Sequence, residues 1–134
     1  PMHNGILNYF DRAQNSFVAA YRKYNQDGDF EIRVDYVSAP ETAGKVLIMA
    51  DPMLATAASM ILSYQALLKK GKPAHTHFVT AIASREGIKQ LTDALGDDPY
   101  TIWVGAIDDE LTARAYIVPG LGDAGDLAFG SKED

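Results

Sequence analysis

The sequence predicts an α/β protein with a mostly parallel, twisted sheet, flanking helices and a projecting antiparallel β-arm. An apolar run of strand length at 45–50 is followed by a helical pattern at 59–70. A second strand-like run, at 75–82, is again followed by a helical pattern. Alternating strands and helices of this kind build parallel sheets. The arm is indicated by a hairpin signal, Asp27-Gly28, between strand-like segments.

The N-terminal elements follow from local pattern. A short helix is expected over 3–11 and a strand over 16–22. After the Asp27-Gly28 turn, apolar and polar residues alternate, which predicts a strand with one buried and one wet face. The expected buried face carries Phe30, Ile32, Val34 and Tyr36, and the wet face carries Glu31, Arg33 and Asp35.

The central elements are bounded by helix signals. The run at 45–50 is apolar on both faces of the expected strand, so we expect it at the centre of the sheet. The helix at 59–70 should end at Gly71. Ser84 is expected to cap a helix that stops at Gly96.

The remaining segments complete the sheet and end in a loop. A strand is predicted at 100–107 and a short one around 114–118. Trp103 in the first of these is expected in the core. Residues 119–130 are rich in glycine and aspartate, so no regular structure is expected there.

Bulk properties exclude several classes. The 134 residues suit one domain, and the net charge of -6 argues against a nucleic-acid partner. No apolar run approaches the ~20 residues that cross a membrane. The absence of cysteine fits a reducing compartment, and we expect a cytoplasmic location.

A candidate phosphate site follows the run at 45–50. Asp51 ends the expected strand, Thr56 and Ser59 offer hydroxyls, and residues 55–59 offer backbone N–H groups at a helix start. The alternative is an ordinary strand-to-helix turn, with Ser59 as its N-cap and Asp51 as a solvated acid. Neither the GxxxxGK[ST] nor the GxGxxG fingerprint is present.

Other candidate sites are weaker. His75 and His77 alternate on one strand and therefore share a face, which suits two metal ligands, but a structural or exposed pair is favoured. Asp108, Asp109 and Glu110 form a carboxylate cluster, for which a solvated loop is favoured.

Two motifs resemble those of uracil phosphoribosyltransferases. DPMLATAAS, at 51–59, resembles that family's 5-phosphoribosyl 1-pyrophosphate (PRPP) motif, including its Asp-Pro start. YIVPGLGDAGDLAFG, at 116–130, resembles the family's uracil-binding loop. The resemblance covers 45–130 well, with SREGI at 84–88, and is traceable from Tyr21-Arg22 through the arm.

The resemblance implies transfer of ribose 5-phosphate from PRPP to N1 of uracil, giving UMP and pyrophosphate, with Mg²⁺ held mainly by the donor's pyrophosphate and no protein metal ligands. It implies catalytic roles for Asp51 and Asp123. The implied PRPP-binding residues are Arg22, Asp51, Pro52, Met53, Leu54, Ala55, Thr56, Ala57, Ala58, Ser59 and Asp123. The implied uracil-binding residues are Tyr116, Ile117, Gly122, Asp123 and Ala124.

Two departures from the family pattern bear on activity. Ala57 and Ala58 stand where the family usually has glycine, so their methyl groups are expected to crowd the phosphate. If both keep helical φ and ψ, their N–H groups still point at the phosphate and the site survives, whereas a need for positive φ would impair it. The family's Arg-Ala-Gly loop should fall before Pro1, so we expect a single domain, 1–134, that lacks its N-terminal part and is a poor catalyst alone.

Three functions therefore stay open. The first is the uracil enzyme, as a homo-oligomer (dimer or tetramer), with regulation by GTP undecided. The second is a non-catalytic sensor of pyrimidine nucleotides with the same fold. The third is a phosphate-binding α/β module with other chemistry, against which the loop at 116–130 argues.

Overall fold

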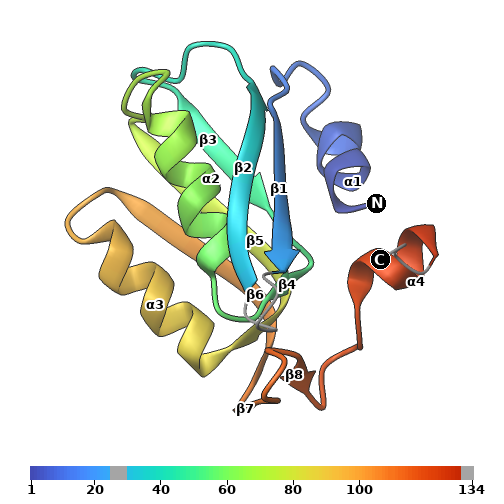
Figure 1. Cartoon of the computed structure of the whole chain (residues 1–134). Helices are drawn as coiled ribbons and strands as arrows, with labels where there is room; N and C mark the ends of the chain where they lie inside the picture. Colours follow the sequence, from blue (N-terminus) through green and yellow to red (C-terminus); the bar gives the residue numbers. More distant parts are fainter. Residues whose placement is uncertain (25–29, 131–134) are drawn as a thin grey trace.

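The computed structural model describes residues 1–24 and 30–130 of the chain (Figure 1). Four helices and eight strands lie in this part of the sequence. In chain order they are α1 Met2–Tyr9, β1 Phe17–Tyr24, β2 Phe30–Ser38, β3 Val46–Ala50, β4 Met53–Leu54, α2 Ala58–Leu68, β5 His75–Ser84, α3 Arg85–Leu95, β6 Tyr100–Asp108, β7 Glu110–Leu111, β8 Ile117–Val118 and α4 Ala124–Phe129.

The main sheet is parallel and is organised around β5. Strand β3 pairs with the first half of β5 and β4 with its end, while β6 pairs along the other side of β5. The expectation that 45–50 forms the centre of the sheet is therefore wrong. Val46 is 62% exposed, and β3 is bonded to β5 alone in the described sheet. The central strand is β5, where side chains are alternately buried.

Helices α2 and α3 contact each other and pack on the same face of this sheet. The face is marked by Phe78, which is 1% exposed and meets Tyr64 of α2 edge-on at 5.6 Å between ring centroids. Leu91 and Leu95 of α3 join the same core cluster. The predicted fold class, a mostly parallel sheet with flanking helices, is confirmed, and the core lies between β5 and these two helices.

The predicted arm is an antiparallel ribbon of β1 and β2 that lies along α2 (Figure 1). Its register shifts between Ala19 and Ala20, because β2 carries one extra residue there. A β-bulge reverses the inside–outside phase of the strand beyond it. Tyr36, expected on the buried face, is accordingly 58% exposed, while Val37 packs on the core. The Asp27-Gly28 turn lies outside the described residues.

The other face of the sheet carries the two histidines and the tryptophan. His75 and His77 share this face as predicted, with ring centroids 4.7 Å apart. Trp103 Nε1 donates to His77 Nδ1 at 3.1 Å, and the tryptophan is 56% exposed. The expectation of a core tryptophan is therefore wrong, because α2 and α3 both cover the opposite face.

The C-terminal region contains more regular structure than the sequence indicated. Strands β7 and β8 pair antiparallel after β6, and a one-and-a-half-turn helix, α4, occupies 124–129. The glycine content concealed this helix, whose start is capped by Asp123. Within the described ranges, none of the helices is long and apolar enough to span a lipid bilayer.

Candidate functional site

The first half of the site is the segment that joins β3 to α2. Asp51 follows β3 directly, and its backbone N–H donates to Val79 O at 3.0 Å, so β5 fixes where the loop begins. The Asp51 carboxylate accepts from the N–H of Met53 at 3.0 Å. Burial raises the pKa of Asp51 above its ordinary value, and this hydrogen bond opposes the rise. Asp51 is thus a partly desolvated acid at the strand end, and not a fully solvated one.

The loop turns into α2 at Ala57, which has φ 62° and ψ -2°. This is the left-handed region, which costs a residue with a Cβ about 1–2 kcal/mol. Ala57 is only 3% exposed, and its methyl belongs to the core cluster. The methyl is thus packed inside the protein, while the positive φ is the backbone conformation that was expected to impair the site. Ala58 is already the first residue of the helix.

Helix α2 begins without a side-chain cap, since Ala57 occupies the N-cap position. The alternative in which Ser59 caps the helix is therefore wrong. The first N–H groups of a helix have no intrahelical acceptor and attract anions. Helices α3 and α4 differ, because Ser84 and Asp123 cap them. Among the described residues, no side chain therefore accepts from the first N–H groups of α2.

The end of β5 supports this loop from behind. Ser84 Oγ donates to Ala55 O at 2.5 Å and accepts from Gly87 N at 2.8 Å. Gly87 lies so close to the loop that a Cβ there would stand 2.4 Å from Ala55 O and 2.7 Å from Leu54 O. Ser84 was expected as a helix cap, and this is confirmed; its contact with the loop was not foreseen.

The second half of the site is the segment that follows β6. Ile117 of β8 is 2% exposed, and Tyr116 pairs by its carbonyl with Thr112 N at 2.8 Å. Gly120 has φ 56°, and a Cβ there would stand 2.1 Å from Ile117 O, so this turn requires glycine. Asp108 accepts from Gly120 N at 2.9 Å. This aspartate, expected in a solvated loop, is half-buried and holds the turn.

Asp123 begins α4 and accepts from the N–H groups of Gly125 at 2.8 Å and Asp126 at 3.0 Å. Its neighbours Gly122 and Ala124 are exposed and half-buried, respectively. A carboxylate used in this way fixes the direction of the preceding backbone. The segment at 122–124 therefore presents its backbone in a defined conformation.

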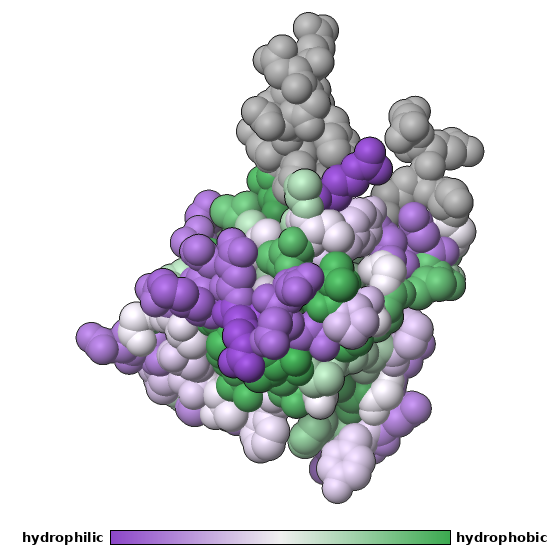
Figure 2. Space-filling model, turned by 90° about the horizontal axis from the view of Figure 1, so that it is seen from below, coloured by the Kyte–Doolittle hydropathy of each residue, from purple (hydrophilic) through white to green (hydrophobic). Residues whose placement is uncertain are grey.

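The sheet brings both halves to one edge. Strands β3 and β6 flank β5 at two strand spacings, about 10 Å, and β6 extends further: Ala50 ends β3 opposite Val79, whereas Asp108 ends β6 opposite Ser84. In open α/β sheets ligands bind at this edge. Figure 2, which views the molecule from below Figure 1, shows hydrophilic residues gathered over hydrophobic ones on this side. Residues 51–59 follow β3 directly, whereas residues 116–124 follow β6 by way of β7 and include β8, so both segments come after the carboxyl end of a strand that pairs with β5.

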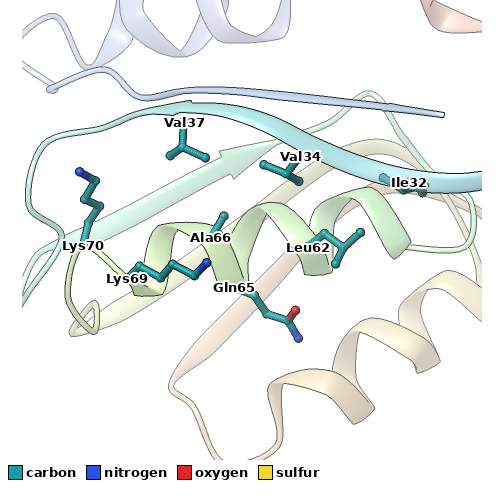
Figure 3. A pocket seen from close by; sticks show the side chains of 8 residues that line it. All are labelled: Ile32, Val34, Val37, Leu62, Gln65, Ala66, Lys69 and Lys70. Atoms are coloured by element: carbon teal, nitrogen blue, oxygen red, sulfur yellow. The ribbon is translucent and has the colours of Figure 1, made fainter. Parts of the chain in front are cut away.

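Two hollows lie near the ribbon. One, of about 730 Å³, contains Asp51 and Ser59 and runs between α1, β1, β3 and α2. The other, of about 550 Å³, lies between β2 and α2 (Figure 3). In it, Ile32 and Val34 face Leu62, with lysines at the end of the helix. This second groove contains none of the expected site residues.

The structure describes Arg22, the residue of the arm that is expected to contact PRPP, only in part. Arg22 lies in β1 with its backbone opposite Ile32, and its side chain is outside the described part of the structure. Its neighbour Tyr21 donates its hydroxyl to Asp35 at 2.6 Å.

Sequence reasoning missed two supporting residues, Gly87 and Asp108. A glycine in the first turn of a predicted helix, where it costs stability, was the available signal for Gly87. No local signal marked Asp108, because its partner Gly120 lies in another loop.

Fold and site together define an α/β protein in which a strand-to-helix loop of the kind that binds phosphate follows a parallel strand at its carboxyl end. The family model described as uracil phosphoribosyltransferase matches residues 1–131. The chain belongs to the uracil phosphoribosyltransferase family.

Individual relatives agree. A uracil phosphoribosyltransferase of Porphyromonas gingivalis is 51% identical over 132 residues, which are 98% of this chain and 61% of that protein. The protein of that name from Methanothermobacter thermautotrophicus is 40% identical over the whole chain and 60% of its own length. The solved AQ2163 protein of Aquifex aeolicus superposes with a TM-score of 0.84 at 32% identity, covering 96% of this chain and 59% of that one. The chain thus spans about three-fifths of these relatives.

Proposed function

We propose that the protein carrying this chain transfers ribose 5-phosphate from PRPP to N1 of uracil, forming UMP and pyrophosphate in cytoplasmic pyrimidine salvage. The observation that carries the proposal is the joint placement of two motifs. The segment 51–59 runs from a parallel strand into an uncapped helix, and the segment 116–124 follows β6 of the same sheet by way of β7. Membership of the family supplies the substrate class.

In this proposal the 5′-phosphate of the donor lies on the backbone of residues 55–59 at the start of α2. The free N–H groups there and the helix dipole both favour a dianion. The hydroxyls of Thr56 and Ser59 add donors of the same kind, and Pro52, Met53, Leu54 and Ala58 shape the loop. Arg22 contributes its charge from the arm.

Asp51 is assigned to the ribose hydroxyls. A partly desolvated carboxylate gains more from such hydrogen bonds than one in water, since the local dielectric is lower. Two hydroxyls held by one acid fix the ring, which places the anomeric carbon for attack. Positive charge develops on the ribose as the pyrophosphate leaves, and the acid stabilises that charge.

Uracil is assigned to the segment that contains Tyr116, Ile117, Gly122, Asp123 and Ala124. Backbone N–H and C=O groups held by the Asp108–Gly120 bond and the Asp123 cap can read the donors and acceptors of the base edge. A base without matching groups would leave these backbone groups unpaired, which is costly. Asp123 also contacts the donor in this proposal.

Mg²⁺ is assigned to the pyrophosphate of the donor, whose charge it neutralises. Among residues 1–24 and 30–130, no three ligand-type side chains are grouped so as to hold a metal. The family resemblance places the ion on the donor, so we name no protein ligand. Assembly into a dimer or tetramer and a response to GTP are proposed on family grounds alone.

One experiment tests the function. The complete gene product is incubated with uracil, PRPP and Mg²⁺, and UMP is quantified, with cytosine in place of uracil as the control. We expect UMP with uracil only. Absence of product while UMP still binds would refute the enzyme and favour the non-catalytic sensor, an alternative that the strained backbone at Ala57 supports.

A further inference from the structure

We infer that Ser84 is a positioning residue for the phosphate loop, acting through the peptide between Ala55 and Thr56. The inference rests on the proposed function, because it names what the loop is held in place for. Ser84 lies at the end of β5, 29 positions along the chain from Ala55, and it is 0% exposed. The Ser84 hydroxyl is therefore shielded from solvent and bonds to the loop.

Both capacities of the hydroxyl are used. The hydroxyl donates a hydrogen bond to Ala55 O at 2.5 Å, and its oxygen accepts one from the N–H of Gly87 at 2.8 Å. The second bond caps α3, which any serine N-cap does. The first bond is additional, because a capping hydroxyl needs no acceptor of its own. It connects the start of α3 to the loop before α2.

Through the geometry of the peptide unit, the bond from Ser84 to Ala55 O also determines the direction of the next N–H group. In a planar trans peptide the C=O of one residue and the N–H of the next point in opposite directions. Because the carbonyl of Ala55 is drawn inward to Ser84, the N–H of Thr56 must point outward from the loop. Ser84 thereby fixes the direction of one of the N–H groups assigned to the 5′-phosphate.

Gly87 allows the first turn of α3 to approach the phosphate loop closely, because it has no side chain. A Cβ at this position would stand 2.4 Å from Ala55 O and 2.7 Å from Leu54 O, closer than van der Waals contact allows. The first turn of α3 therefore lies directly against the loop backbone. The positive end of the α3 dipole also favours the carbonyl oxygen that points toward it.

The test compares Ser84→Ala with a control at the other end of the same helix. Gly96→Ala places a Cβ in open space at φ 55°, so it strains the end of α3 without touching the loop. Both variants weaken the helix, but only Ser84→Ala releases Ala55. Steady-state kinetics of the complete gene product give KM for PRPP, KM for uracil and kcat.

We expect Ser84→Ala to raise KM for PRPP by about three- to ten-fold, the effect of one misdirected hydrogen bond. KM for uracil and kcat should change by less than about two-fold, and Gly96→Ala should leave all three constants near wild type. Equal changes in both KM values, or the same pattern in Gly96→Ala, would overturn the inference and leave Ser84 a helix cap.

A second measurement does not depend on catalysis. Backbone ¹⁵N order parameters of residues 55–58 should fall in Ser84→Ala toward values of mobile backbone and stay unchanged in Gly96→Ala. Unchanged order parameters in Ser84→Ala would overturn the inference whatever the kinetics. A wild-type protein that forms no UMP would instead refute the proposed function, while the order parameters still decide the role of Ser84.

Discussion

Replacing Ala57 by glycine tests whether the phosphate loop holds backbone strain. Ala57 has φ 62°, and relief of this left-handed strain should stabilise the fold by about 1–2 kcal/mol. Two costs oppose the gain. The buried methyl contributes about 0.8 kcal/mol, and glycine adds about 0.5–1 kcal/mol of unfolded-state entropy. The terms nearly cancel, so the free energy of unfolding should change by less than about 1 kcal/mol.

Ala83→Gly is the matched control. Ala83 is 0% exposed in β5 and is absent from the residues with positive φ in the described chain. The same methyl and entropy costs apply there without relief of strain, so a loss of about 1.3–1.8 kcal/mol is expected. Urea denaturation of both variants measures the difference. If Ala57→Gly destabilises the protein as much as Ala83→Gly, the loop is not strained.

Three further outcomes are expected. Because burial raises the pKa of Asp51 in the folded state, its contribution to stability falls as pH rises from 3.8 through the raised value. Asp51→Asn keeps the acceptor for Met53 N–H, so in urea melts its free energy of unfolding should rise relative to wild type as pH increases across that window. UMP formation should be lost. If the free energies of unfolding of the two proteins change with pH in parallel, the burial of this charge is not the cause. Gly120→Ala should raise KM for uracil at least about ten-fold and Gly5→Ala, in open space on α1, far less, with equal effects counting against the turn's role. Asp123→Asn keeps a capping oxygen, so α4 should persist by circular dichroism while kcat falls by about ten-fold or more; unchanged kcat would remove the carboxylate from the reaction.

Local signals predicted what depends on neighbours in sequence. Ser84 and Gly96 marked both ends of α3, because a cap and a left-handed stop are properties of single residues. The loop at 51–59 was placed correctly between strand and helix for the same reason. Its identity as a donor-binding segment came from resemblance to a family and stays a prediction.

Features set by distant contacts were missed. The central position of β5 depends on which strands lie beside it, and the apolar run at 45–50 carried no information about its neighbours. A bulge opposite Ala19 exposed Tyr36, although the alternation around it was regular. Asp108 and Gly120 meet only because β6 and the loop after β8 fold together.

The tryptophan on the open sheet face gives the molecule its own optical probe. Trp103 is the single tryptophan of the chain, and its indole N–H bonds to His77. Its fluorescence therefore arises from one known place, on the face away from α2 and α3. Anything that covers this face should shift the emission to shorter wavelength, whereas events confined to the phosphate loop should leave the spectrum unaltered.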